Sequence, residues 1–195
     1  MIFFKSFYFF RNLNWFFLRK KLQGISLLIL DVDGVMTTGQ FLYTKEGKQM
    51  KIFGPDDNDA ISLVREHLEV RFITGDRKGF DISSKRIVDD MKLPLDLVST
   101  VNRIDWIIER YNPKDVIYMG DGIFDHYVMQ KVAYSIAPSS ADENALKFAN
   151  YVTKRKGGER AVAEACLHIM SKFFKPYNPN KYPYSKKLFG EWNTQ

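Results

Sequence analysis

The stretch ISLLILDVDGV, residues 25–35, decides the expected fold class of this chain. Its apolar run leads directly into two acidic residues, Asp31 and Asp33, and then into Gly34. A continuous apolar run of this length is typical of a strand that is buried on both faces of a parallel sheet. The two carboxylates are two residues apart and can project toward one place, and the glycine permits a sharp exit of the chain close to a ligand. The stretch therefore predicts a buried strand that carries acidic groups at its carboxyl end.

Strand and helix signals alternate along the chain after this first strand. Segments 40–44 and 49–53 flank the turn sequence KEGK and predict a β-hairpin. Further strands are expected over 70–74, 95–98, 116–119, 134–137 and 151–153, and helices over 57–68, 80–91, 102–111, 126–132, 141–149 and 159–173. This alternation predicts an α/β fold, a Rossmann-like three-layer domain with a parallel central sheet, a β-hairpin flap after the first strand and no large cap domain.

The length and the charge distribution predict one folded domain between two basic ends. The chain has 195 residues, which is a usual size for a single domain. We expect an aromatic and basic N-terminal segment over 1–24, the folded domain over 25–173 and an irregular tail over 174–195. The net charge is +6, but residues 1–24 carry +5 and residues 171–195 carry +4, so the middle carries −3. Because a nucleic-acid-binding domain concentrates positive charge on its folded part, we expect no nucleic-acid partner.

The N-terminal segment leaves two interpretations open. Nine of the first eighteen residues are aromatic, and Lys5 and Arg11 interrupt the apolar stretch. Because a membrane span needs about 20 mainly apolar residues, we do not expect one here. The segment either packs as a helix on the domain or on a neighbouring subunit, or lies as an aromatic, basic helix at a membrane surface.

Cysteine and histidine usage restricts the chemistry further. The chain has one cysteine, Cys166, and three scattered histidines. This excludes a disulfide within the chain and a cysteine-based metal cluster. It fits a reducing compartment, most simply the cytoplasm.

Polar residues also follow two of the other predicted strands. Thr74 and Gly75 end the strand at 70–74, and the strand at 116–119 runs into the sequence GDGIFD, which contains Asp121 and Asp125. Arg103 stands at the start of a predicted helix. Ligands of parallel α/β sheets bind outside the carboxyl ends of the strands, so these groups should converge there. Several carboxylates, a hydroxyl and one cation at one edge predict a Mg²⁺ site that handles phosphate.

Taken together, these motifs resemble the haloacid-dehalogenase-like phosphohydrolases. The similarity runs through LLILDVDGVMT, FITGD, VNRIDWI, YMGDGIFDHYVM and YVTKRKGGERAVAEAC. The GGERAV stretch and the hairpin are similar to the capless branch that contains the 3-deoxy-D-manno-octulosonate 8-phosphate and nonulosonate 9-phosphate phosphatases. The resemblance implies a Mg²⁺-dependent phosphomonoesterase that hydrolyses a small sugar phosphate. It also implies a homotetramer, in which neighbouring subunits cover the open site.

The resemblance implies that hydrolysis proceeds through an aspartyl-phosphate. Asp31 would be the nucleophile. Asp33 would protonate the leaving alkoxide and then deprotonate the attacking water. Asp31, Asp121 and the backbone carbonyl of Asp33 would hold Mg²⁺, which offsets the repulsion between carboxylate and phosphate.

The same resemblance implies supporting roles for the remaining residues. Thr74 and Arg103 would bind the transferring phosphoryl group, and Asp125 would orient either the metal's water or Arg103. Supporting glycines and candidate substrate contacts complete the set: Gly34, Gly75 and Gly120 for the loops, and Asp57, Asp76 and Arg160 for the substrate.

Three positions depart from the family pattern. Relatives usually carry Lys at Arg103, often carry Asp at Gly122, and the octulosonate enzyme carries Arg at Asp76. We expect the acidic residues at this edge to repel the carboxylate of a sugar acid, and therefore expect a substrate other than the octulosonate phosphate. These acids are Asp56, Asp57, Asp59 and Asp76. A non-catalytic oligomerisation or regulatory relative, and a phosphotransferase with the same intermediate, are the alternative functions.

Overall fold

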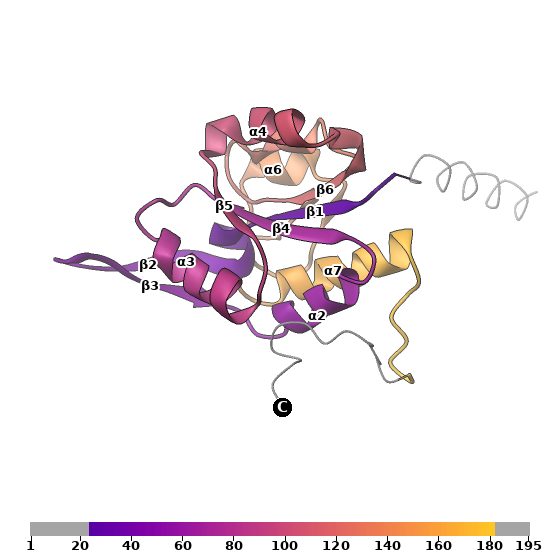
Figure 1. Cartoon of the computed structure of the whole chain (residues 1–195), viewed down its shortest axis with the longest axis horizontal. Coiled ribbons are helices and arrows are strands. Elements are labelled where there is room, and N and C mark those ends of the chain that lie inside the picture. Colours follow the sequence, from indigo (N-terminus) through magenta and orange to yellow (C-terminus); the bar gives the residue numbers. More distant parts are fainter. Residues whose placement is uncertain (1–23, 182–195) are drawn as a thin grey trace, which may run out of the picture.

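The strand predicted from the opening stretch forms the centre of a parallel sheet (Figure 1). The computed structural model describes residues 24–181. Strand β1 (Leu27–Asp31) is buried along its whole length. It pairs in parallel with β4 (Glu69–Thr74) on one side and β6 (Val116–Met119) on the other. The buried apolar run therefore lies where both of its faces are covered.

The six strands of the sheet have the order β5-β4-β1-β6-β7-β8, and all of their pairings are parallel. The outer strands are β5 (Leu95–Leu97), β7 (Tyr134–Ala137) and β8 (Tyr151–Val152). The chain builds one half of the sheet outward from β1 and then crosses back to build the other half. The carboxyl ends of β1, β4 and β6 are therefore adjacent at the point of reversal, where α/β sheets bind ligands.

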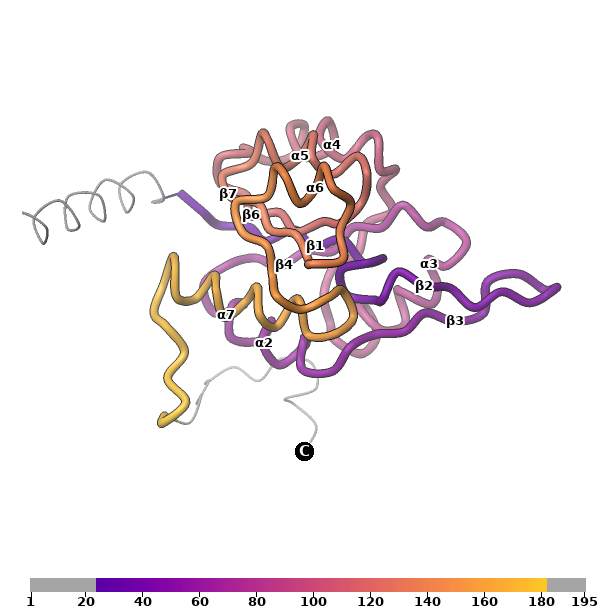
Figure 2. The backbone as a smooth tube through the Cα atoms, turned by 180° about the vertical axis from the view of Figure 1, so that it is seen from behind, coloured from indigo at the N-terminus to yellow at the C-terminus, as the bar shows by residue number. Residues whose placement is uncertain are grey.

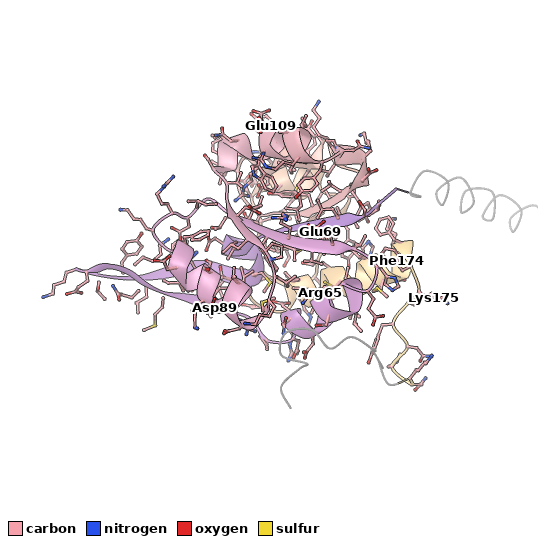
Figure 3. The ribbon with its side chains drawn as sticks, viewed as in Figure 1. Arg65, Glu69, Asp89, Glu109, Phe174 and Lys175 are labelled. Carbon is pink, nitrogen blue, oxygen red and sulfur yellow. The ribbon has the colours of Figure 1, made fainter. Side chains whose placement is uncertain are left out.

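Helices cover both faces of the sheet, which confirms the expected three-layer architecture (Figures 1 and 2). One layer contains α2 (Asp57–Val64) and α7 (Ala161–Phe173). The other contains α4 (Arg103–Arg110), α5 (Asp125–Met129) and α6 (Glu143–Phe148). In Figure 3, Arg65 after α2 and Glu109 on α4 mark these two opposite sides. Each layer encloses its own apolar cluster against the sheet, and Cys166 is buried in the α7 layer.

An antiparallel hairpin follows β1, as the sequence predicts, and it extends away from the sheet (Figures 1 and 2). Its strands are β2 (Thr37–Thr44) and β3 (Gly47–Phe53). Helix α3 (Phe80–Ser84), continued by wider turns over Lys85–Asp90, lies beside the base of the hairpin. Five large apolar side chains of the hairpin are exposed: Phe41, Leu42, Tyr43, Met50 and Ile52. No large cap domain interrupts the described chain.

The predicted helix boundaries are less accurate than the predicted elements. Helix α2 ends at Val64 rather than residue 68, and α7 begins at Ala161 rather than 159. The later start follows from Gly158 and Arg160, which both have positive φ and break the helical path. Residues 174–181 contain no helix or strand. The expectations for residues 1–23 and 182–195 lie outside the described residues, and none of the helices in 24–181 is long and apolar enough to span a membrane.

Candidate active site

The loop after β1 brings two of the predicted site residues to the edge of the sheet. The backbone N–H of Val32 donates to Asp31 Oδ1 at 2.8 Å and so fixes the carboxylate at the end of the strand. Gly34 has a φ of 82°, and a Cβ at this position would overlap the carboxylate of Asp121. The glycine therefore allows the β1 loop to lie directly against the β6 loop, as the sequence predicts for a close approach.

Thr74 and Asp33 meet above the ends of β4 and β1. Thr74 Oγ1 donates to Asp33 Oδ2 at 2.9 Å and accepts a bond from the backbone N–H of Asp76 at 3.1 Å. The hydroxyl is therefore held by the loop that follows its own strand. Gly75 lets this turn pass close to Thr100.

Arg103, the first residue of α4, joins the acidic residues of two different strand ends. Its Nη1 donates to Asp31 Oδ2 at 2.6 Å and its Nη2 donates to Asp31 Oδ1 at 2.9 Å, which is a bidentate pair. Nη1 also donates to Asp125 Oδ1 at 2.6 Å and to the hydroxyl of Tyr118 at 3.0 Å. The arginine is only 2% exposed. It is therefore a fixed cation that touches the predicted nucleophile.

Asp125 is held from several directions at the end of β6. The Tyr118 hydroxyl donates to its Oδ1 at 2.6 Å, and the backbone N–H of Gly122 donates to its Oδ2 at 2.8 Å. A Cβ at Gly120 would overlap this carboxylate. Gly122, where relatives often have an acid, thus contributes its backbone to the orientation of Asp125. Tyr118, which its strand position predicts only as a core residue, has a polar function in the site as well.

Three carboxylates converge in a way that suits a hard cation. Oxygen atoms of Asp31, Asp121 and Asp125 lie within 4.8 Å of one another. Burial raises the pKa of the Asp31 carboxyl above its ordinary value, although Arg103 opposes this shift. Burial, and then the charge of Asp31, raises the pKa of Asp121. The charged forms of the Asp31 and Asp121 carboxylates are thus unfavourable by themselves. A divalent cation bound between these carboxylates would stabilise their charged forms.

The site opens into a cavity of about 490 Å³ at this edge of the sheet. Its walls combine the strand-end acids with Arg103 and with residues of the hairpin and of the α5 loop. The wall residues from these last two segments are Phe41, Lys48, Ile123 and Phe124. A cavity of this volume suits a small phosphorylated molecule whose phosphoryl group lies at Asp31.

Sequence reasoning missed the lysines of β3. The Lys51 ammonium lies 2.8 Å from Asp33 Oδ1 and 2.9 Å from Asp76 Oδ2, and Lys48 also pairs with Asp76. No motif marks these lysines. The only signal in the sequence is that Lys51 stands between two apolar residues of β3, Met50 and Ile52, and this pattern leaves open which of them face inward.

The acidic residues after the hairpin do not form the repulsive surface that the sequence suggests. Asp76 is neutralised by Lys48 and Lys51, and Asp56 pairs with Arg160 Nε at 2.6 Å. Asp57 is 1% exposed, and its Oδ1 accepts from the backbone N–H of Ala163 at 2.8 Å. Within one subunit, Asp57 and Arg160 therefore do not line the cavity, whereas Asp76 does. These pairings weaken the charge argument against a sugar-acid substrate, which counted the acids without their partners, and the choice of substrate stays a prediction.

Comparisons with known proteins agree with the fold and the motifs. No family model matches the chain. The 3-deoxy-D-manno-octulosonate 8-phosphate phosphatase of Salmonella typhi is 33% identical over 156 residues, which cover 75% of this chain and 79% of that protein. The crystal structure of the Yersinia pestis enzyme of the same name superposes with a TM-score of 0.65 at 30% identity, over 81% of this chain and 87% of that one. The Moraxella catarrhalis enzyme, solved in complex with a magnesium ion, a phosphate ion and a KDO molecule, shares the fold with a TM-score of 0.65 at 22% identity, over 80% of this chain and 91% of that one.

Proposed function

The chain belongs to the haloacid-dehalogenase-like phosphatases related to 3-deoxy-D-manno-octulosonate 8-phosphate phosphatase, and on this premise we propose that it is a Mg²⁺-dependent hydrolase of a small sugar phosphate. The reaction passes through an aspartyl-phosphate on Asp31. The single observation that carries this proposal is the bidentate contact of Arg103 with Asp31 at the end of β1. A buried guanidinium beside a carboxylate nucleophile is a preorganised site for the charge of a phosphoryl group.

The roles of the neighbouring residues follow from their contacts. Asp31 attacks phosphorus, and Arg103 stabilises the negative charge of the transferring group. Asp33, which Thr74 contacts at 2.9 Å, gives a proton to the leaving alkoxide and later takes one from water. Asp125 does not react, because Arg103, Tyr118 and Gly122 occupy its oxygens. It orients Arg103.

Mg²⁺ is the proposed cofactor, and the donor set fits it. Asp31 and Asp121 offer carboxylate oxygens, which hard cations prefer, and the backbone carbonyl of Asp33 is the further ligand that the family resemblance implies. When bound, the ion would reduce the repulsion between the Asp31 carboxylate and the phosphate dianion. The magnesium ion reported in the Moraxella catarrhalis complex supports this assignment.

The proposed substrate is a phosphorylated sugar acid of the octulosonate or nonulosonate kind, or a related sugar phosphate. Two observations support it: the relatives act on such a compound by name, and two of the local acids, Asp56 and Asp76, are paired with arginine and lysines. We also propose a homotetramer in the cytoplasm. An assembly would cover the open cavity and the exposed apolar side chains of the hairpin.

The test is release of inorganic phosphate from a panel of sugar phosphates, with Mg²⁺ and with excess chelator. We expect turnover only with the metal, inhibition by Ca²⁺ because its looser shell misplaces the reacting groups, and loss of turnover in Asp31→Asn. The panel contains the octulosonate 8-phosphate, a nonulosonate 9-phosphate, and neutral and amino sugar phosphates. Activity of Asp31→Asn above about a tenth of the wild type, or full activity in chelator, contradicts the mechanism.

A further inference from the structure

Lys51 is buried and its ammonium is surrounded by polar groups from three segments. Its side chain is 0% exposed. Nζ lies 2.8 Å from Asp33 Oδ1 and 3.1 Å from Asp33 Oδ2. It also lies 2.9 Å from Asp76 Oδ2 and donates to Ser83 Oγ on α3 at 2.8 Å. One ammonium thus joins the β1 loop, the β4 loop and α3.

The inward orientation of Lys51 is opposite to what hydrophobicity favours in a half-exposed strand. Its neighbours Met50 and Ile52 are 59% and 56% exposed, while the lysine between them is buried. Desolvating an ammonium is costly unless it is paired, and a strand normally turns its apolar residues inward. The hairpin therefore places a charge where packing alone would place a methionine or an isoleucine, which indicates a role in the site.

The contacts with Asp33 point to that role. Thr74 binds only Oδ2 of this carboxylate, so Thr74 alone leaves the plane of the carboxyl group free to rotate. The Lys51 ammonium donates to Oδ2 and also lies 2.8 Å from Oδ1 as an ion pair, and this second contact restricts the rotation. Proton transfer requires the acid to lie within hydrogen-bond reach of the leaving oxygen in a defined orientation.

We propose that Lys51 is a positioning residue that fixes the Asp33 carboxyl group for protonation of the leaving alkoxide. This inference rests on the proposed function, because it assigns Lys51 a part in the step that Asp33 performs. Asp76 and Ser83 also bind the ammonium and hold it in place. The tight path of the lysine over the β4 loop supports this arrangement, since a Cβ at Gly79 would collide with Lys51 Cε, Lys48 Cδ and the Asp76 carboxylate.

The test compares two substrates whose leaving groups differ in their need for an acid. The first is the sugar phosphate of the panel with the highest kcat/KM, which releases a basic alkoxide. The second is 4-nitrophenyl phosphate, which releases a stable phenolate without protonation. The variant is Lys51→Met, which has similar length and no charge. The matched control is Lys45→Met at the hairpin tip, where the lysine side chain is 92% exposed.

For Lys51→Met we expect kcat/KM on the sugar phosphate to fall by about 10²-fold, and kcat/KM on 4-nitrophenyl phosphate by less than about threefold. The ratio kcat/KM depends only on the steps up to departure of the leaving group. The later step, in which Asp33 acts as a base toward water, therefore does not affect the comparison. Lys45→Met should match the wild type on both substrates. Ser83→Ala removes one hydrogen-bond partner of the Lys51 ammonium but keeps the charges of Lys51 and Asp33. It should also lower kcat/KM selectively on the sugar phosphate, by a smaller factor than Lys51→Met.

Equal losses on both substrates, or no loss on either, overturn the positioning role, because a purely structural residue would affect them alike. If Lys51→Met does not fold, Ser83→Ala decides between the same outcomes. Failure of the proposed function has a different signature: the wild type then hydrolyses neither substrate in Mg²⁺, or Asp31→Asn remains active on both.

Discussion

Replacing Arg103 with Met should separate the catalytic role of this residue from its structural role. In the wild type the guanidinium makes four hydrogen bonds with Asp31, Asp125 and Tyr118, all buried. Loss of the cation leaves two buried carboxylates next to each other and to Asp121. Breaking a buried ion pair costs about 3–5 kcal/mol, a large part of a typical free energy of unfolding of about 5–15 kcal/mol.

The expected loss of activity follows from the same contacts. Removing one preorganised donor to a charged transition state lowers turnover by about 10²–10³-fold. Arg103 also holds both oxygens of the nucleophile, so the loss should be at the upper end of this range. Arg103→Lys keeps the charge but cannot reproduce the bidentate contact, so we expect its activity to lie between those of the wild type and Arg103→Met.

Magnesium should rescue the stability of Arg103→Met more than that of the wild type. The variant has lost the arginine that contacts this carboxylate cluster, so a divalent cation would replace the lost positive charge. A ligand that binds only the folded state stabilises it by about 2.7 kcal/mol at a hundred times its Kd. Tighter metal binding in the variant therefore appears as a larger increase in the free energy of unfolding when Mg²⁺ is added.

The assay measures phosphate release and urea unfolding for the wild type, Arg103→Met, Arg103→Lys and Arg71→Met. The last is the control, because Arg71 also makes a 2.6 Å ion pair, with Asp96, but lies outside the cavity. We expect unchanged kcat/KM in Arg71→Met. If kcat/KM of Arg103→Met stays within about threefold of the wild type, Arg103 does not act on the phosphoryl group and the reasoning is refuted.

Two further predictions concern Asp57 and Gly34, which take no direct part in the reaction. Burial raises the pKa of Asp57 from 3.8 to about 6, so its contribution to stability is complete below about pH 4 and is lost as the pH rises through 6. As the pH rises from about 4 to about 6, the free energy of unfolding of Asp57→Asn, measured in urea, should therefore increase by up to about 3 kcal/mol relative to that of the wild type. A difference between the two proteins that stays constant with pH contradicts this. Gly34→Ala should weaken Mg²⁺ binding by about tenfold or more in a metal titration, because its Cβ would displace Asp121; unchanged metal affinity would show that the β1 and β6 loops are not so closely packed.

The sequence was sufficient to predict the sheet and the strand-end motifs, because these depend on local patterns. The apolar run of β1 has one stable position, the centre of a parallel sheet, and its register sends Asp31 to the carboxyl edge. Arg103 and Asp121 line the cavity at the same edge for the same topological reason, and Thr74 ends the neighbouring strand in contact with Asp33. The roles of these residues stay predictions until the variants are measured.

Contacts between distant segments could not be read from local patterns. Lys51 lies 32 positions from Ser83, and their meeting depends on how the hairpin folds back against α3. Asp57 lies 106 positions from Ala163, so the sequence predicts its carboxylate at the substrate, whereas it binds the start of α7. In both cases the residue type was visible in the sequence, but its partner was determined by packing of whole elements.

The distribution of charge in the cavity explains why a simple count of acids misled. Around Asp33 and Asp76, two carboxylates face two lysines and balance them. Around Asp31, Asp121 and Asp125, three carboxylates face one guanidinium, which leaves a formal charge of −2. Because burial already disfavours the charged form of Asp31 and Asp121, this second group is where a divalent cation would bring the site to neutrality. The acidic character of the cavity is thus concentrated at the proposed metal position, whereas the wall that contains Lys48 and Asp76 is balanced in charge.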